Sequence, residues 1–239
     1  MRRALTAVLA AVVTLCVCAC APAAESDPRP VTTAESELLA AMRFKNFDAG
    51  TRPFTTTVVE QGTSLHLNGW VDYASHTGYA AVTGEGFEPQ ALLWTADTVA
   101  IRPAAPDDAG LPVLPIPALS DQTWTSRTLQ ADASALDATL ALIGNLGADR
   151  PENPLLVQQT GALWLREDEI DGTAVTVFAA PPSDEVVDAD TLDPDESPLR
   201  LWLDESGLLR RAQVRQSDFW YDIDFGLDPG PALAVTTDG

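Results

Sequence analysis

The chain has 239 residues, 46% of them hydrophobic, which is enough to bury a full core and argues against a disordered polypeptide. Its 35 acidic side chains outnumber the 14 lysines and arginines, so the formal net charge is -21. A surface of this sign repels nucleic acid and anionic lipid headgroups, and nucleic-acid binding is therefore excluded.

The N-terminus has the pattern of a secretory signal. Arg2 and Arg3 precede an apolar stretch at 4–17, which is too short to span a bilayer of about 30 Å. The stretch runs into Val17-Cys18-Ala19-Cys20, which resembles a bacterial lipobox. The resemblance implies cleavage before Cys20 and anchoring by acyl chains, palmitate among them, to the extracytoplasmic side of the cell membrane. The alternative is an ordinary secretory signal with incidental cysteines.

The positions of the cysteines and the local composition indicate four segments in the chain. All three cysteines lie before residue 21, so the folded part is expected to have no disulfide, no cysteine metal site and no cysteine nucleophile. We expect a lipoprotein signal peptide at 1–19, a disordered tether at 20–32, a folded domain at 33–226 and a flexible tail at 227–239.

The first half of the domain is predicted to begin with a helix and continue in strands. Thr32 and Glu35 stand at capping-box spacing, which predicts a helix over 34–47. Period-2 alternation then predicts strands at 54–60, 65–73, 79–83 and 92–102, with a bend or turn at Asp97 in the last of them. The proline-rich stretch 103–117 is either a long connection or a lid over a cavity.

The second half is predicted to begin with a helix over 135–146, capped by Asp132 or Ser134. Asn153-Pro154 should break the chain before an extended segment at 155–167 and a strand at 173–180. An acidic loop at 184–196 is either solvated or a Ca²⁺ ligand set, although it lacks the EF-hand glycine and closing glutamate.

Residues 199–214 form the clearest hairpin, because Leu199, Leu201 and Leu203 alternate with polar side chains up to a turn that contains Gly207. A third strand follows at 219–225. Strands that arrive as hairpins predict an α+β fold with a curved antiparallel β-sheet of about 8–11 strands, wrapped around two or more helices.

No motif for catalysis or phosphate binding is present, and the two histidines, His66 and His76, lack a metal-like companion at i+2 or i+4. We therefore expect no enzyme activity, no cofactor and no metal. Trp70, Trp202 and Trp220 fall on the polar parity of their strands. They either shield the outer side of the sheet or form a contact face for a partner or the bilayer interface.

The lipobox, the early helix, the hairpin at 69–78 and the Leu-Trp-Leu-Asp turn at 201–211 together resemble the mycobacterial-type LppX/LprG lipoproteins, which share the LolA/LolB-like half-barrel. The resemblance implies an apolar cavity for acyl chains, and carriage of a lipid or lipoglycan by a monomer without catalysis. The apolar positions expected to face that cavity are Leu65, Leu67, Val71, Leu93, Val99, Leu201 and Ile223. The alternative is a membrane-tethered interaction or sensor domain with a filled core, which needs no cavity.

Overall fold

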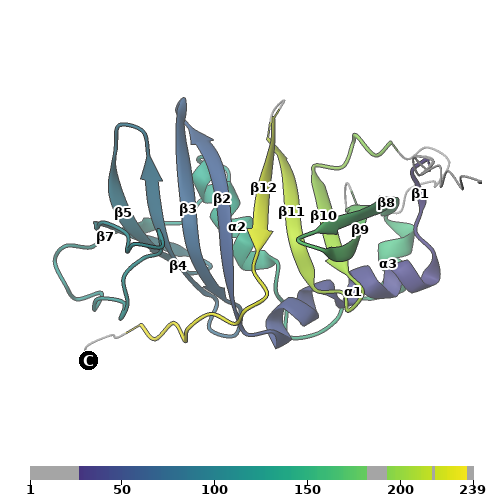
Figure 1. Ribbon diagram of the computed structural model, residues 1–239, viewed down its shortest axis with the longest axis horizontal. Helices are drawn as coiled ribbons and strands as arrows, with labels where there is room; N and C mark the ends of the chain where they lie inside the picture. Colours follow the sequence, from purple (N-terminus) through teal and green to yellow (C-terminus); the bar gives the residue numbers. More distant parts are fainter. Residues whose placement is uncertain (1–26, 182–192, 217–218, 236–239) are drawn as a thin grey trace, which may run out of the picture.

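The structure is a computed structural model that describes residues 27–181, 193–216 and 219–235. Within these residues, twelve strands form one sheet and three helices pack against it (Figure 1). In chain order the elements are β1 (Arg29–Pro30), α1 (Thr33–Asp48), β2 (Thr51–Glu60), β3 (Thr63–Asp72), β4 (Thr77–Gly84), β5 (Phe87–Trp94), β6 (Thr98–Pro103), β7 (Thr125–Thr128), α2 (Ala135–Asn145), α3 (Pro154–Gln159), β8 (Leu163–Ile170), β9 (Thr173–Ala179), β10 (Leu199–Asp204), β11 (Leu209–Gln216) and β12 (Phe219–Phe225).

The sheet is antiparallel and is not closed. Its order is β1-β8-β9-β10-β11-β12-β2-β3-β4-β5-β6-β7, so two meanders that each follow the chain are joined where β12 pairs with β2. The predicted fold class is thereby confirmed. The strand count exceeds the expected 8–11, because 92–102 is a hairpin of two strands rather than one, and the short β1 and β7 extend the two edges.

Local signals in the sequence place two of the helices. Thr32 caps α1 and forms the complete capping box with Glu35, and the side chain of Ser134 caps α2. The predicted extended segment from 155 is wrong, because α3 lies at Pro154–Gln159. Asn153 accepts a hydrogen bond from Leu155 N, and Pro154 occupies the first turn, where its missing N–H costs nothing.

The predicted hairpin at 199–214 is formed by β10 and β11, with Leu201 opposite Ala212. Gly207 in the connecting turn has a φ of +81°, the left-handed conformation that glycine adopts without steric cost. The turn packs closely against α1. A Cβ atom added to Gly207 would lie only 3.2 Å from Cδ1 of Leu38.

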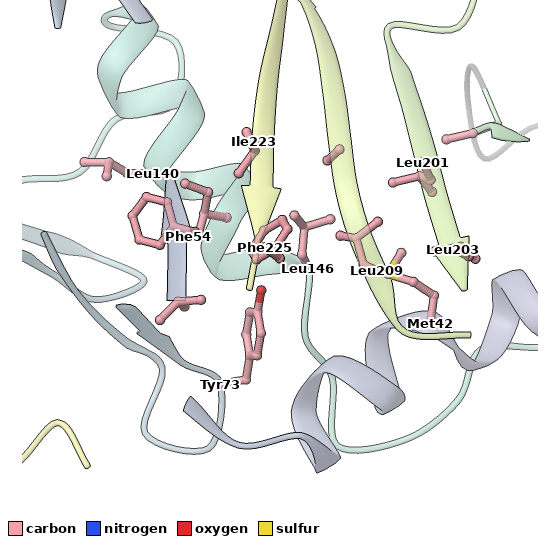
Figure 2. Packing of buried hydrophobic residues seen from close by; sticks show 14 of the residues in the cluster. Met42, Phe54, Tyr73, Leu140, Leu146, Leu201, Leu203, Leu209, Ile223 and Phe225 are labelled. Atoms are coloured by element: carbon pink, nitrogen blue, oxygen red, sulfur yellow. The ribbon is translucent and has the colours of Figure 1, made fainter. Parts of the chain in front are cut away.

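The main core lies between the helices and one face of the sheet, which we call the helix-bearing face. Figure 2 shows how Met42 of α1, Leu140 of α2 and Phe54, Leu209 and Ile223 of the strands converge there. All five are buried, and Leu140, Leu209 and Ile223 have no exposed surface. Alternation along the strands therefore supplies one continuous apolar layer, as period-2 patterning requires.

Part of the opposite, outer face is also covered by the chain itself. Ile116 of the proline-rich segment and Leu233 of the C-terminal segment pack with Trp70 in a separate apolar cluster, to which Tyr79 and Leu93 also belong. The proline-rich stretch is thus a connection that covers part of the outer face. The expected loose tail is corrected for 227–235, because burying Leu233 holds that part of the chain in place.

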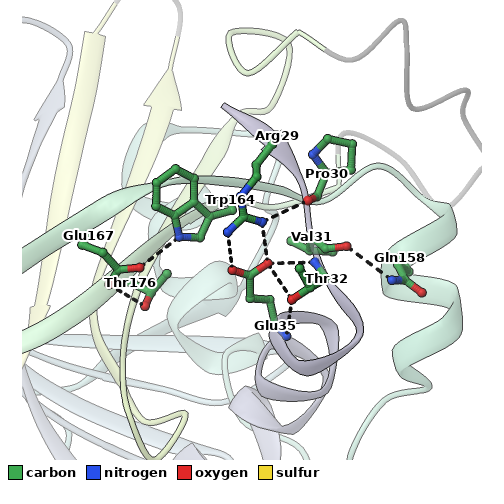
Figure 3. A network of polar contacts seen from close by, with 9 residues as sticks. All are labelled: Arg29, Pro30, Val31, Thr32, Glu35, Gln158, Trp164, Glu167 and Thr176. Carbon is green, nitrogen blue, oxygen red and sulfur yellow. Dashed lines mark hydrogen bonds and ion pairs between the residues drawn. The ribbon is translucent and has the colours of Figure 1, made fainter. Parts of the chain in front are cut away.

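The expected tether is too long at its C-terminal end. Arg29 and Pro30 form β1, which pairs with Trp164 and Leu163 of β8. The Arg29 guanidinium also stacks over the Trp164 ring at 4.6 Å and bonds both carboxylate oxygens of Glu35 at 2.7 and 2.8 Å (Figure 3). These contacts order the chain from Arg29 onwards.

Glu35 is expected to make the stability of this junction depend on pH. Hydrogen bonds from Arg29 are the largest influence on its carboxyl, and with those from Thr32 they outweigh burial and lower its pKa to about 2. The stabilisation is therefore complete above the ordinary pKa of about 4.3 and is lost as the pH falls through about 2. Glu35→Gln should cost about 1 kcal/mol at pH 7, since the pair is partly exposed.

Urea unfolding of the wild type and Glu35→Gln at pH 7 and at pH 2 to 3 measures this difference. The difference in stability between the two proteins should be smaller at the lower pH and should vanish only below about pH 2. Glu37→Gln on the exposed side of α1 is the control and should change little at either pH. A difference between wild type and Glu35→Gln that is the same at both pH values would contradict the assignment.

Candidate functional site: a cleft beside helix α2

An open cleft of about 300 Å³ lies between α2 and the end of the C-terminal meander. We call it the α2 cleft. Most of its wall is apolar, and three elements of the sheet and one helix contribute to it. Its lining residues are Ala138, Thr139, Leu142, Pro198, Leu199, Val214, Arg215, Gln216, Tyr221 and Ile223.

The register of three strands explains where the cleft begins. Leu201, Ala212 and Ile223 are cross-strand neighbours and form a row that is fully enclosed in the core. The next row on the same face consists of Leu199, Val214 and Tyr221, which are only half-buried. Cross-strand neighbours two residues further along share a face, so the core row continues into the cleft floor. The cleft floor is apolar because β10, β11 and β12 continue to alternate apolar and polar side chains beyond the part that α2 covers closely.

Arg215 borders the cleft, but its side chain has the parity of Trp220 and points to the outer face of the sheet. Its Nη1 donates to the backbone oxygen of Asp195 and its Nη2 to that of Glu196 at 3.3 Å, and the guanidinium lies 5.6 Å from the Trp220 ring. Within the described residues Arg215 forms no ion pair with a carboxylate. An apolar cleft with a few polar groups at its mouth is the usual form of a small-molecule site.

Six of the seven predicted cavity residues lie in the main core: Leu65, Leu67, Val71, Val99, Leu201 and Ile223. Only Ile223 among them lines the α2 cleft. Val71 lines a second, smaller cavity of about 110 Å³ on the other side of α2, with Trp94 and Leu140. The remaining four are packed against other side chains, because the helices fill most of the helix-bearing face.

Leu93 was predicted on the wrong face. It is opposite Ala100 and packs in the outer cluster with Trp70, whereas its neighbours Leu92 and Trp94 face the core. Reading 92–102 as one strand placed Leu93 and Val99 on the same side. The hairpin turn between β5 and β6 resets the alternation, so Val99 pairs with Trp94 instead and faces the core.

The three tryptophans of the predicted contact face lie outside the main core. Trp70 and Trp202 are nevertheless buried, with 9% and 4% of their surface exposed, so they shield the sheet instead of forming a docking surface. Trp202 packs against side chains of β8 and β9, and its Nε1 donates to Asp168 at 3.0 Å. This bond is the largest of the contacts that lower the pKa of Asp168. Trp220 is half-buried, with the Arg200 guanidinium 4.3 Å from its ring.

The cleft residues that sequence reasoning missed are the half-buried ones, above all Leu142, Leu199, Val214 and Tyr221. The inward parity of the three strand residues was visible in the sequence, but the position of α2 and its Leu142 above them was not. Cys20 and most of the acidic loop lie outside the described residues. In the part that is described, no group of three or more His, Cys, Asp or Glu side chains is placed to hold a metal ion. No helix there is long and apolar enough to cross a membrane.

No family model and no curated protein matches the sequence. Among solved structures, the chain is similar to the Mycobacterium tuberculosis lipoprotein LppX, with 13% identity and a TM-score of 0.44 over 82% of this chain and 96% of that one. It is also similar to LprF from Mycobacterium bovis, with 14% identity and a TM-score of 0.44 over 88% of this chain and 100% of that one. Both proteins are of the LppX/LprG type of lipoprotein that the sequence resembles.

Proposed function

We propose that this chain is a lipid-anchored envelope lipoprotein that binds and carries an apolar ligand in the α2 cleft, without catalysis. The observation that carries the proposal is the cleft itself, an apolar opening between α2 and the strands β10, β11 and β12. An acyl chain would lie along Leu199, Val214 and Leu142.

The volume limits the ligand. At about 300 Å³ the cleft is at the lower end of the range of about 300–1,000 Å³ typical of small-molecule sites. This supports a ligand with one acyl chain. A lipoglycan with several chains would require α2 to move away from the sheet, since the side chains of α2 occupy the space between the α2 cleft and the smaller cavity.

The anchor in this proposal is Cys20. The lipobox at 17–20 supports it, and the first described residue, Asp27, follows closely in the chain. Two or three acyl chains on one cysteine hold a protein stably at a membrane, whereas one chain does not. The proposal therefore places the protein on the extracytoplasmic side of the cell membrane.

Filling the cleft should abolish ligand binding. Val214→Trp places a large ring on the cleft floor between Leu199 and Tyr221, and a β-strand accommodates aromatic residues. In the chain purified from Ala21 onwards, we expect the affinity for a dansyl-labelled fatty acid to fall by about tenfold or more. Fluorescence titration measures the affinity, and mass spectrometry of an organic extract identifies any co-purified lipid.

Val59→Trp is the matched control, because it makes the same change on β2 at a position that is 41% exposed and away from the cleft. It should bind like the wild type. Equal affinity of Val214→Trp and Val59→Trp for the fatty acid would show that the ligand does not bind in the α2 cleft. A wild type that binds no fatty acid and carries no lipid would instead indicate the interaction domain.

A further inference from the structure

Helix α3 exposes two adjacent leucines. Leu155 is 61% exposed and Leu156 is 54% exposed, whereas the next residue, Val157, is buried in the main core. The segment is held firmly, because Glu152 N donates to Ala40 O of α1 at 2.9 Å and Thr160 N donates to Leu156 O at 2.9 Å. The two apolar side chains therefore project from an ordered surface.

The same helix stands where the chain enters the fold. Gln158 Nε2 donates to Val31 O at 3.3 Å (Figure 3). Val31 N donates to Ala162 O at 3.3 Å, directly before β8. Residues 21–26 separate Cys20 from Asp27, and a stretch of this length spans at most about 25 Å when fully extended. An anchor at Cys20 thus keeps this edge of the sheet close to the bilayer.

Charge does not oppose contact at this edge, despite the acidic composition of the whole chain. The residues of α3 carry no charge. Beside it, Glu152 is paired with Arg43 at 3.0 Å, and Glu35 is paired with Arg29 at 2.7 Å. Such a surface neither attracts nor repels a zwitterionic headgroup layer, so burial of the leucines decides the contact.

Another exposed apolar pair shows that exposure alone does not identify the surface. Val113 and Leu114 are 54% and 38% exposed, and they follow β6 in the segment that leads to β7. Val113 O accepts from the Tyr79 hydroxyl of β4 at 3.0 Å, and β4 lies eight strands from β1 in the sheet order. With strands about 4.8 Å apart, β4 and β1 are separated by about 40 Å along the sheet. Leu155 and Leu156 differ from Val113 and Leu114 because they lie beside the point where the chain enters the fold.

We infer that Leu155 and Leu156 insert into the interfacial layer of the membrane in which the acyl chains of Cys20 are embedded. The inference rests on the lipid anchor of the proposed function, not on the ligand in the cleft. The anchor and the two leucines together hold the β1 edge of the sheet against the bilayer.

Single-cysteine probes test this contact, since the described residues contain no cysteine of their own. The full acylated protein, carrying Leu156→Cys labelled with NBD, is reconstituted into phosphatidylcholine vesicles with doxyl-labelled lipid. Its control is Val113→Cys, which has the same exposed fraction of 54%. We expect about threefold stronger quenching at 156 than at 113. A second probe, Gln159→Cys, should lose its quenching when Leu155→Ser and Leu156→Ser are added.

Vesicle flotation is recorded in the same samples and separates the two proposals. Protein that floats, with equally weak quenching at 156 and 113, overturns the membrane contact and leaves the anchor intact. Protein that does not float overturns both. A probe at 156 that is blue-shifted but not quenched by doxyl lipid shows that protein, such as residues 182–192, covers the leucines instead, and this also overturns the inference.

Discussion

Replacing Asn46 with alanine is expected to destabilise the protein by about 3–5 kcal/mol, because this one side chain satisfies buried polar groups from three other parts of the fold. Its Oδ1 accepts from Arg52 Nη1 of β2 at 2.8 Å and from Leu209 N of β11 at 3.4 Å. Its Nδ2 donates to Leu146 O, directly after α2, at 2.7 Å. Asn46 itself, on α1, has no exposed surface.

Arg52 makes the loss of Asn46 severe. Arg52 is 2% exposed, and burial lowers the pKa of its guanidinium to about 10, yet it forms no ion pair with any described carboxylate. Its other partners are Gly226 O at 3.0 Å and the Phe225 ring at 5.1 Å. Without Asn46, a buried positive charge loses one of its few compensating contacts, which is more unfavourable than the loss of a neutral hydrogen bond.

Urea unfolding followed by far-UV circular dichroism measures the effect of Asn46→Ala. The matched control is Asn145→Ala, which removes the same side chain at the exposed C-terminal end of α2, next to Leu146. It should change the unfolding free energy by less than about 0.5 kcal/mol. Similar losses in the two variants would show that Asn46 does not connect α1, α2 and the sheet as the hydrogen bonds indicate.

Asn46 also shows why only part of this fold could be predicted. The ends of α1 and α2 depend on capping residues a few positions away, and the β10–β11 hairpin depends on a turn glycine, so short stretches of sequence predicted them. Two of the three partners of Asn46 are 100 and 163 residues distant in the chain. No local pattern reports such contacts, and a single asparagine in a helix does not distinguish a buried network from a solvated surface.

The candidate site, like the fold, could be predicted only where local sequence patterns determine it. The alternation in 199–225 placed Leu199, Leu201 and Ile223 on one face correctly, because the pleat imposes this pattern. It did not reveal which of them are enclosed, since enclosure depends on how far α2 extends over the sheet. Leu93 was misplaced for a different reason: a hairpin turn changes the parity, and Asp97 alone did not distinguish such a turn from a bend within one strand.

Leu201→Ala is expected to destabilise the protein by about 2–5 kcal/mol without changing the affinity for a fatty acid. Leu201 is 3% exposed and is flanked on the sheet by Ala212 and by Phe178 of β9, both fully buried. Truncation leaves a cavity that these neighbours can fill only in part, and the residue does not line the α2 cleft. Chemical unfolding and fluorescence titration give the two readouts.

Leu199 provides the reciprocal comparison, because it lies two residues earlier on the same strand and on the same face. It is half-buried and lines the α2 cleft, so water or ligand already contacts it and its truncation creates little new void. Leu199→Ala should therefore cost about 1 kcal/mol or less and weaken fatty-acid binding, the opposite of Leu201→Ala. If the two substitutions destabilise equally and neither changes binding, the core is closed at both positions. If Leu201→Ala alone alters binding, the ligand reaches deeper than the cleft, into the core row of Leu201, Ala212 and Ile223.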